Sequence, residues 1–342
     1  MNSVNIICSY SAHSPSKWTL RYIDMLKEFT GFESVALFST GSEATEAFWR
    51  CMRVYSGKPG IWGGLVDPDE VGTEKPLSDA MHGMTLGALI MAGRLTWPEL
   101  GVFPELGAER FGKGENYTCG AIFEPYHGPS AQFHREDPTL TRIRENQRTF
   151  DIPFCSDEIQ AGFGRTGKLF GFEWYDKFRP DFVTIGKGCG AGLPLSALLG
   201  PKEIMESEAV KEHAHLHSTH SGHPIMCAAG CAVIEEIQRQ DLISRSYNLG
   251  IMLKNHLDGC GVRFHAGRGL LAGLEFDGPE QAAKVTTLCK KKGLLVVDTH
   301  RKWVKLGPAF TISDQAIENG CQILKAAISE VIDGQENRKI QD

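Results

Sequence analysis

Two short apolar segments that do not alternate with polar residues most constrain the fold of this chain. Residues 152–157 (IPFCSD) and 182–186 (FVTIG) each suit a strand with hydrophobic residues on both faces. Strands buried on both faces are typical of parallel sheets covered by helices. A polar helix expected at 139–150 and a strand at 120–124 continue this alternation of helix and strand. The sequence therefore predicts an α/β fold with a mostly parallel sheet.

The N-terminal part adds a helix, a strand and a second helix to this pattern. Apolar residues at helical spacing predict a helix over residues 15–30, which a glycine ends. A strand is expected at 35–39, and after the turn at residues 40–42 (TGS) a helix is expected to begin at Glu43. Residues 57–80 are rich in Gly, Pro and Asp, so we expect a long loop there.

The pattern of expected helices and strands changes near residue 225, where a smaller α+β domain is expected to begin. The expected elements are helices at 225–257, at 280–291 and after Ser313, and short strands within 262–276 and 294–306. The predicted domains are therefore a large domain over 1–224 and a linking helix with a small domain over 225–342.

Composition excludes several classes of partner and location. There are 36 basic and 42 acidic residues, so the formal net charge of −6 favours neither nucleic acid nor a membrane surface as a partner. No stretch of 18 apolar residues occurs, and the N-terminus does not resemble a secretory signal. The ten cysteines are scattered without a CxxC motif, as in a cytoplasmic protein with reduced thiols.

Three predicted strand ends carry residues that could act together. Asp157 and Lys187 each end a strand, and residues 40–43 (TGSE) end a third. In an open parallel sheet, ligands bind beyond the carboxyl ends of the strands, and the start of a helix there offers free N–H groups to a phosphate. A phosphate cradle, a carboxylate and a lysine at this edge fit pyridoxal 5'-phosphate (PLP), whose chemistry uses a lysine for the Schiff base and an aspartate at the pyridine nitrogen.

Five motifs in order then resemble one family, the class III (ω-) aminotransferases among the fold-type-I PLP enzymes. The motifs are TGSEATE (40–46), MHGMTLGAL (81–89), FEPYHGP (123–129), SDEIQAGFGRTG (156–167) followed by PDFVTIGKG (180–188), and HSTHSGHP (217–224). The resemblance implies a large PLP-binding domain with a mixed, mostly parallel sheet of the seven-stranded type and a smaller C-terminal domain. It also implies a homodimer with active sites at the interface.

Matched positions imply roles for the residues around the cofactor. Lys187 would form the internal aldimine and move the proton, and Asp157 would pair with the pyridine nitrogen. The other implied cofactor residues are Gly41 and Ser42 at the phosphate, Met81 and His82 on one ring face, Ile159 on the other, Gln160 at the ring hydroxyl, and Thr219, reaching the phosphate of the neighbouring subunit. For the substrate, the resemblance implies Glu124 and Lys305.

Three departures from the family pattern bear on the substrate pocket. Met81 stands where the family has an aromatic residue against the ring, so the stack is expected to be weaker. Lys305 stands where the family has an arginine. Family members carry a longer segment before the phosphate turn than the residues that precede Gly41 here, so we expect a shortened N-terminus.

The function implied is transfer of an amino group from an amine or ω-amino acid to a keto acid, pyruvate or 2-oxoglutarate. An aminomutase or racemase of the same fold and a non-catalytic PLP-binding homologue remain open as alternatives. The histidines at 213, 215, 217, 220 and 223 would suit a transition metal if they alternated on a strand, but no metal is expected. Cys155 and Cys189 flank the site and are expected to be small buried hydrophobic residues.

Overall fold

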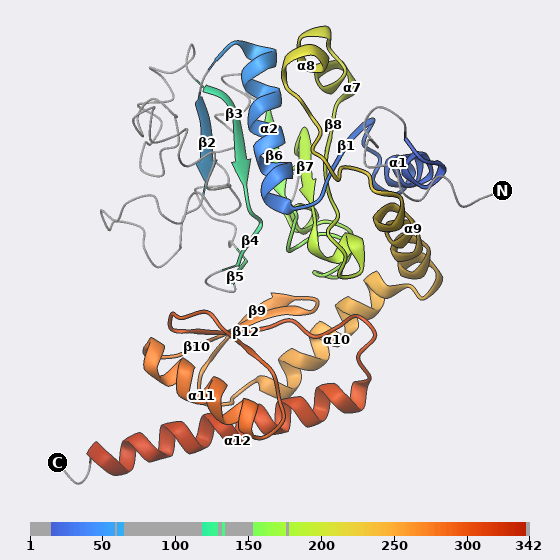
Figure 1. Cartoon of the computed structure of the whole chain (residues 1–342). Helices are drawn as coiled ribbons and strands as arrows, with labels where there is room; N and C mark the ends of the chain where they lie inside the picture. Colours follow the sequence, from blue (N-terminus) through green and yellow to red (C-terminus); the bar gives the residue numbers. More distant parts are fainter. Residues whose placement is uncertain are drawn as a thin grey trace. The chain divides into compact units, whose positions relative to one another are not determined.

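The computed structural model of the protein describes residues 15–58, 60–64, 118–128, 132–133, 153–175 and 178–339. The chain divides into two compact units (Figure 1). The first comprises Met1–Pro125, Arg135–Phe163 and Phe172–Gln238, and the second comprises Tyr126–His134, Gly164–Gly171 and Arg239–Asp342. The last passage of the chain from the first unit to the second lies between Gln238 and Arg239. The domain boundary expected between residues 224 and 225 stays a prediction.

A mixed sheet forms the centre of the first unit. Its strands in the described residues are β1 (Ser34–Phe38), β2 (Gly60–Gly64), β3 (Thr118–Phe123), β6 (Phe154–Asp157), β7 (Phe182–Ile185) and β8 (Ser196–Gly200), in the order β1-β8-β7-β6-β3-β2. Strands β2, β3, β6 and β7 pair in parallel, whereas β8 is antiparallel to β7 and β1. The mostly parallel α/β sheet is confirmed; a seventh strand stays a prediction.

Strand β2 corrects the expectation of a loop over residues 57–80. Residues 60–64 (GIWGG) pair in parallel with β3, although three of the five are glycines, which weaken a strand. Its pairing partner β3 lies more than fifty residues later in the chain, so the local sequence does not predict this strand. Residues 65–80 and the helix expected at 139–150 lie outside the described residues.

Helix α2 (Gly41–Ser56) covers one face of this sheet. Phe48 and Met52 project from it into a core that also contains Phe182 of β7 and Leu198 of β8. The rings of Phe48 and Phe182 lie 5.2 Å apart. All four side chains are at most 1% exposed, so the helix is fixed against the strands that carry the predicted site.

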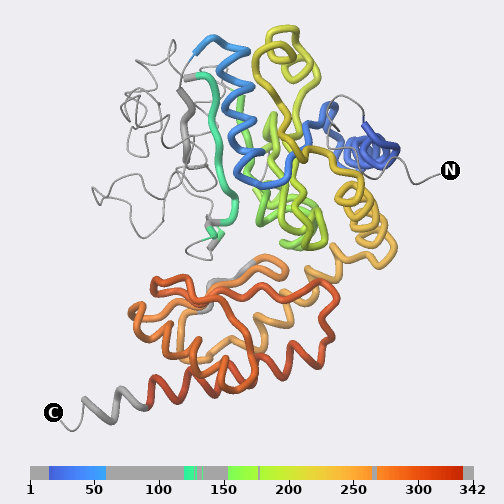
Figure 2. Tube along the Cα trace, in the orientation of Figure 1, coloured from blue at the N-terminus to red at the C-terminus, as the bar shows by residue number. Residues whose placement is uncertain are grey.

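Helix α1 (Lys17–Thr30) packs beside α9 (Pro224–Arg239), as Figure 2 shows in blue and gold. Ser16 caps the start of α1, and Gly31 ends it with a φ of 74°, which favours glycine. The helix predicted over residues 15–30 is thus confirmed. Two short helices, α7 (Lys202–Met205) and α8 (Glu208–His213), lie between β8 and α9.

In its described residues, the second unit contains an antiparallel sheet and three helices. Its elements are β9 (Arg263–Arg268), β10 (Leu271–Glu275), β11 (Val297–Asp298), β12 (Trp303–Leu306), α10 (Leu242–Leu257), α11 (Pro279–Lys291) and α12 (Asp314–Lys339). The sheet order is β11-β12-β10-β9. Helices α10 and α11 contact the sheet and α12 packs on both helices, around a core that includes Leu253, Leu274, Val304 and Ile328. The helices and strands expected in this part are confirmed.

A hairpin of β4 (Tyr126–His127) and β5 (Gln132–Phe133) also belongs to the second unit. In the part of the chain that the structure describes, no helix combines the length and the apolar character needed to cross a membrane.

Candidate active site

The turn between β1 and α2 forms the first part of the site. Thr40 caps α2: its Oγ1 accepts a hydrogen bond from the N–H of Glu43 at 3.2 Å, and Glu43 Oε2 accepts from the N–H of Thr40 at 2.8 Å. This capping box starts the helix at Gly41, two residues before the predicted start. The first N–H groups of a helix have no partner within it, so Gly41 and Ser42 present donors to an anion.

Asp157 lies at the carboxyl end of β6, opposite Thr184 in the register with β7. Its Oδ1 accepts two hydrogen bonds, from the Thr184 hydroxyl at 3.2 Å and from the N–H of Ile159 at 3.0 Å. The residue is 9% exposed. The two donors come from neighbouring strand ends, and they fix the orientation of the carboxylate.

Lys187 follows β7 by two residues and begins the 3₁₀ turn η3 (Lys187–Gly190). Since β6 and β7 are adjacent parallel strands, Asp157 and Lys187 emerge at the same edge of the sheet. The backbone of Lys187 is left-handed, with a φ of 46°, and its side chain is exposed. Such a conformation costs about 1–2 kcal/mol for a non-glycine residue and is concentrated at functional sites.

Ile159 brings the phosphate turn and the lysine strand together. A Cβ on Gly41 would lie 2.6 Å from Ile159 Cδ1, and a Cβ on Gly186 would lie 3.2 Å from Ile159 Cγ2. Only glycines allow both backbones to approach this side chain so closely. Gln160 follows and is partly exposed. The structure thus gathers the predicted residues Gly41 and Ile159 with the strand ends of Asp157 and Lys187, and Gln160 follows Ile159 in the chain.

Two supporting hydroxyls were missed by sequence reasoning. Thr184 donates to Asp157, and the Ser196 hydroxyl donates to the carbonyl oxygen of Thr40 at 2.6 Å, which ties β8 to the phosphate turn. Both side chains are fully buried. Each is a lone hydroxyl in an otherwise apolar strand segment, and that was the only signal in the sequence.

The remaining predicted residues lie in different places. Glu124 follows β3 in the first unit and is 7% exposed, whereas Thr219 is exposed in the turn region after α8. Lys305 lies in β12 of the second unit, where its Nζ donates to the carbonyl oxygen of Gly128 at 3.4 Å. Met81 and His82 lie outside the described residues.

The five histidines between residues 213 and 223 do not alternate on a strand. His213 ends α8 and the other four lie in irregular backbone, so they do not form the alternating arrangement that a metal site on a strand would need. Within the described ranges, no three His, Cys, Asp or Glu side chains come together as metal ligands.

Cys155 and Cys189 are fully buried, as predicted. Burial raises the pKa of the Cys189 thiol to about 12 and that of Cys155 well above its ordinary value. Neither thiol is therefore a nucleophile at neutral pH.

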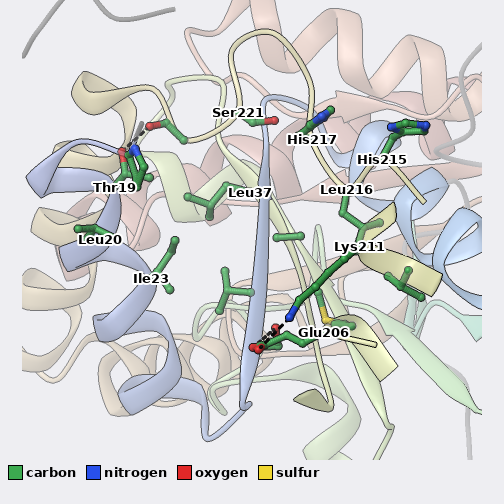
Figure 3. A pocket seen from close by; sticks show the side chains of 17 residues that line it. Thr19, Leu20, Ile23, Leu37, Glu206, Lys211, His215, Leu216, His217 and Ser221 are labelled. Carbon is green, nitrogen blue, oxygen red and sulfur yellow. Dashed lines mark hydrogen bonds and ion pairs between the residues drawn. The ribbon is translucent and has the colours of Figure 1, made fainter. Parts of the chain in front are cut away.

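A pocket of about 510 Å³ opens along the outer edge of β1. Figure 3 shows that α1, β1 and the segment around His215 and Ser221 line it. Lys211 and Glu206 form an ion pair at 4.0 Å in its wall. It contains neither Asp157 nor Lys187, so this pocket is separate from the candidate active site.

Comparisons with known proteins identify relatives of this chain. The sequence is 27% identical over 340 residues to ornithine aminotransferase of Emericella nidulans, covering 91% of this chain and 73% of that one. It is 28% identical over 319 residues to acetylornithine aminotransferase of Haemophilus ducreyi, covering 90% of this chain and 77% of that one.

Solved structures share the fold. The acetylornithine aminotransferase of Elizabethkingia anophelis superposes with a TM-score of 0.73 at 22% identity, over 92% of this chain and 79% of that one. An S-selective transaminase from Arthrobacter sp. superposes with a TM-score of 0.73 at 20% identity, over 93% of this chain and 81% of that one. The family model described as aminotransferase class-III matches residues 105–328, which is more than half of the chain. The protein therefore belongs to the class III aminotransferase family.

Proposed function

We propose that Lys187 is the reacting amine of this PLP-dependent aminotransferase and that Asp157 is its partner carboxylate. The observation that carries the proposal is the pairing of β6 with β7, which brings both residues out at one edge beside the phosphate turn.

The residues present fit PLP. The N–H groups at Gly41 and Ser42 suit its phosphate, and the close approach of Gly41 to Ile159 leaves an apolar surface beside that anion site. When bound, the cofactor supplies a carbonyl carbon that accepts an amine and a ring that draws electrons from the adjoining carbon. Asp157 would hold the proton on the ring nitrogen, and Gln160 is proposed to hydrogen-bond the ring hydroxyl. Met81 and His82 are proposed for the opposite ring face.

The proton transfer is assigned to Lys187. Its Nζ removes the proton from the carbon of the donor that bears the amino group, as a general base. The exposed position of the side chain at the strand end supports this role, since the base must reach the donor carbon.

We propose an ω-amino acid or amine as donor and a keto acid as acceptor. Ornithine and acetylornithine aminotransferases are among the relatives, which supports a donor with a terminal amine. Glu124 is proposed for the substrate side of the pocket and Lys305 for the acceptor carboxylate. Lysine provides a point charge rather than the two-pronged grip of arginine, so discrimination among keto acids should be weak.

Variants at Lys305 test the proposed binding of the acceptor carboxylate separately from the roles of Lys187 and Asp157. Lys305→Arg should raise kcat/KM for 2-oxoglutarate by about tenfold, the order of one charge-assisted hydrogen bond. If Lys305→Ala changes kcat/KM for neither pyruvate nor 2-oxoglutarate, Lys305 lies outside the pocket.

A homodimer and a cytoplasmic location complete the proposal. The exposed position of Thr219 supports contact with the phosphate of the partner subunit. The nine described cysteines are all free thiols, which supports a reducing compartment.

Lys187→Ala tests the central assignment, with Lys202→Ala, an exposed lysine at the start of α7, as the matched control. We expect Lys187→Ala to lose steady turnover while still binding PLP, and the control to match the wild type. Wild-type turnover in Lys187→Ala would overturn the proposal. With amine but no keto acid, the wild type should stop after one equivalent; continued conversion would instead favour an aminomutase or racemase.

A further inference from the structure

The turn that carries Lys187 is held in an unfavourable backbone conformation. Both Lys187 and Ala191 have positive φ values, 46° and 52°. Backbone hydrogen bonds around the turn run from the N–H of Cys189 to the carbonyl oxygen of Gly186 at 3.2 Å, from that of Ala191 to Gly188 at 3.4 Å, and from that of Leu193 to Gly190 at 2.9 Å. Two left-handed non-glycine residues so close together persist only where the surroundings fix them.

Cys189 is the one side chain of this turn that points into the protein. The turn reads Lys-Gly-Cys-Gly, and apart from the exposed lysine it has no other side chain. Cys189 is 0% exposed, and its Sγ donates to the carbonyl oxygen of Leu195 at 3.2 Å. Because burial raises its pKa to about 12, the thiol keeps its proton and remains a donor at neutral pH.

Leu195, whose carbonyl oxygen accepts this hydrogen bond, is next in the chain to a residue that contacts the phosphate turn. Leu195 precedes Ser196, whose hydroxyl donates to the carbonyl oxygen of Thr40 at 2.6 Å. Packing at Leu195 is also close, since a Cβ on Gly190 would lie 2.9 Å from Leu195 Cβ. Two consecutive residues thus connect the turn of the lysine to the turn of the phosphate.

Tyr22 of α1 supports the turn from the inner side. It is 0% exposed, and a Cβ on Gly230 would lie 2.5 Å from its ring, so it fills the space between α1 and α9. Burial raises the pKa of Tyr22 well above its ordinary value, and neighbouring thiols raise it further. Those thiols belong to Cys189, Cys227 and Cys231. Cys227 and Cys231 lie on α9 and share this environment without belonging to the lysine turn.

We propose that Cys189 is a positioning residue for Lys187, and that its thiol, through Leu195 and Ser196, sets the lysine turn relative to the phosphate turn. The inference rests on the proposed function of Lys187. A residue that only filled space would need the size of the Cys189 side chain but not its thiol as a donor. The proposed role depends on the hydrogen bond from this thiol to the carbonyl oxygen of Leu195.

Three variants separate these roles. Cys189→Ala removes the donor, Cys189→Ser keeps a donor of similar size, and Cys227→Ala removes a buried thiol beside Tyr22 but outside the turn. For each, we would measure kcat and KM, and titrate the visible absorbance of the PLP-loaded protein against pH. In the apoprotein, hydrogen–deuterium exchange of the peptide containing residues 187–191 would report on the turn without cofactor.

We expect Cys189→Ala to lower kcat about three- to tenfold with KM little changed, as for loss of one hydrogen bond that positions the base. The midpoint of its absorbance titration should shift, exchange of the turn should accelerate, and Cys189→Ser should restore most of each change. Cys227→Ala should match the wild type in all three.

Equal effects of Cys189→Ala and Cys227→Ala would overturn the inference, as would a Cys189→Ser variant as impaired as Cys189→Ala. Failure of the proposed function would look different. In that case Lys187→Ala would keep the visible absorbance and the turnover of the wild type, whatever Cys189 does.

Discussion

Arg165 offers a quantitative test of how the second unit is held together. The guanidinium donates from Nη1 to the carbonyl oxygen of Pro308 at 2.7 Å and from Nη2 to that of Leu270 at 3.0 Å. It also lies over the ring of Phe310, 5.0 Å from its centre. Burial lowers the pKa of Arg165 to about 10, so it remains charged at neutral pH. One side chain thus joins three segments of the unit.

Arg165→Met keeps much of the apolar volume and removes both hydrogen bonds. A hydrogen bond from a charged donor contributes about 1.5–3 kcal/mol, and loss of the donor leaves both carbonyls without this partner. Two such bonds would together contribute about 3–6 kcal/mol. Because Arg165 is partly exposed, solvent screening reduces this sum, and we expect the free energy of unfolding to fall by about 2–4 kcal/mol. Urea titration followed by circular dichroism measures this change.

Arg263→Met is the matched control, because Arg263 pairs with Glu275 at 3.5 Å but its side chain is 57% exposed. Loss of such a pair should change stability by less than about 1 kcal/mol. If Arg165→Met is no more destabilising than Arg263→Met, the carbonyls of Pro308 and Leu270 do not depend on the guanidinium and the reasoning is refuted.

Three further predictions concern the first unit. Gly41→Ala should weaken PLP binding by about 1–3 kcal/mol in a fluorescence titration because Ile159 must move aside, whereas Gly278→Ala, with no atom within 4 Å of the added Cβ, should not. Burial raises the pKa of Cys51 from its ordinary 9.0 to about 12, so between pH 9 and 12 the thiol ionises only in the unfolded protein. The free energy of unfolding of the apoprotein should therefore fall as pH rises through this range, and it should fall less steeply in Cys51→Val. Thr219→Ala should abolish the stabilisation of the dimer by PLP in sedimentation, and an unchanged dimer response would remove Thr219 from the interface.

The N-terminal helices show what local sequence can determine. Ser16 and Gly31 mark the two ends of α1, and the structure uses both as caps. At α2 the predicted start was two residues late, because Glu43 is the third residue of the helix, where it completes the capping box, rather than the first. Capping depends on neighbours within four residues, so such boundaries can be inferred from the sequence.

Strands and supporting contacts were harder to predict because they depend on distant partners. Residues 60–64 form β2 only through pairing with β3, and no strand was predicted for the segment that forms β8. The roles of Thr184 and Ser196 follow from the sheet register, which places each hydroxyl beside a residue far away in the chain. The family motifs indicated Asp157 and Lys187, whereas the groups that hold them became visible only in the folded sheet.

The most direct test of the account is to identify the lysine that becomes linked to the cofactor. The PLP-loaded protein would be reduced with borohydride, digested and analysed by mass spectrometry. We expect a pyridoxyl group on the peptide that contains Lys187, and none in the same experiment on Lys187→Ala. Stoichiometric labelling of any other lysine in the wild type would contradict the assignment of the strand-end site.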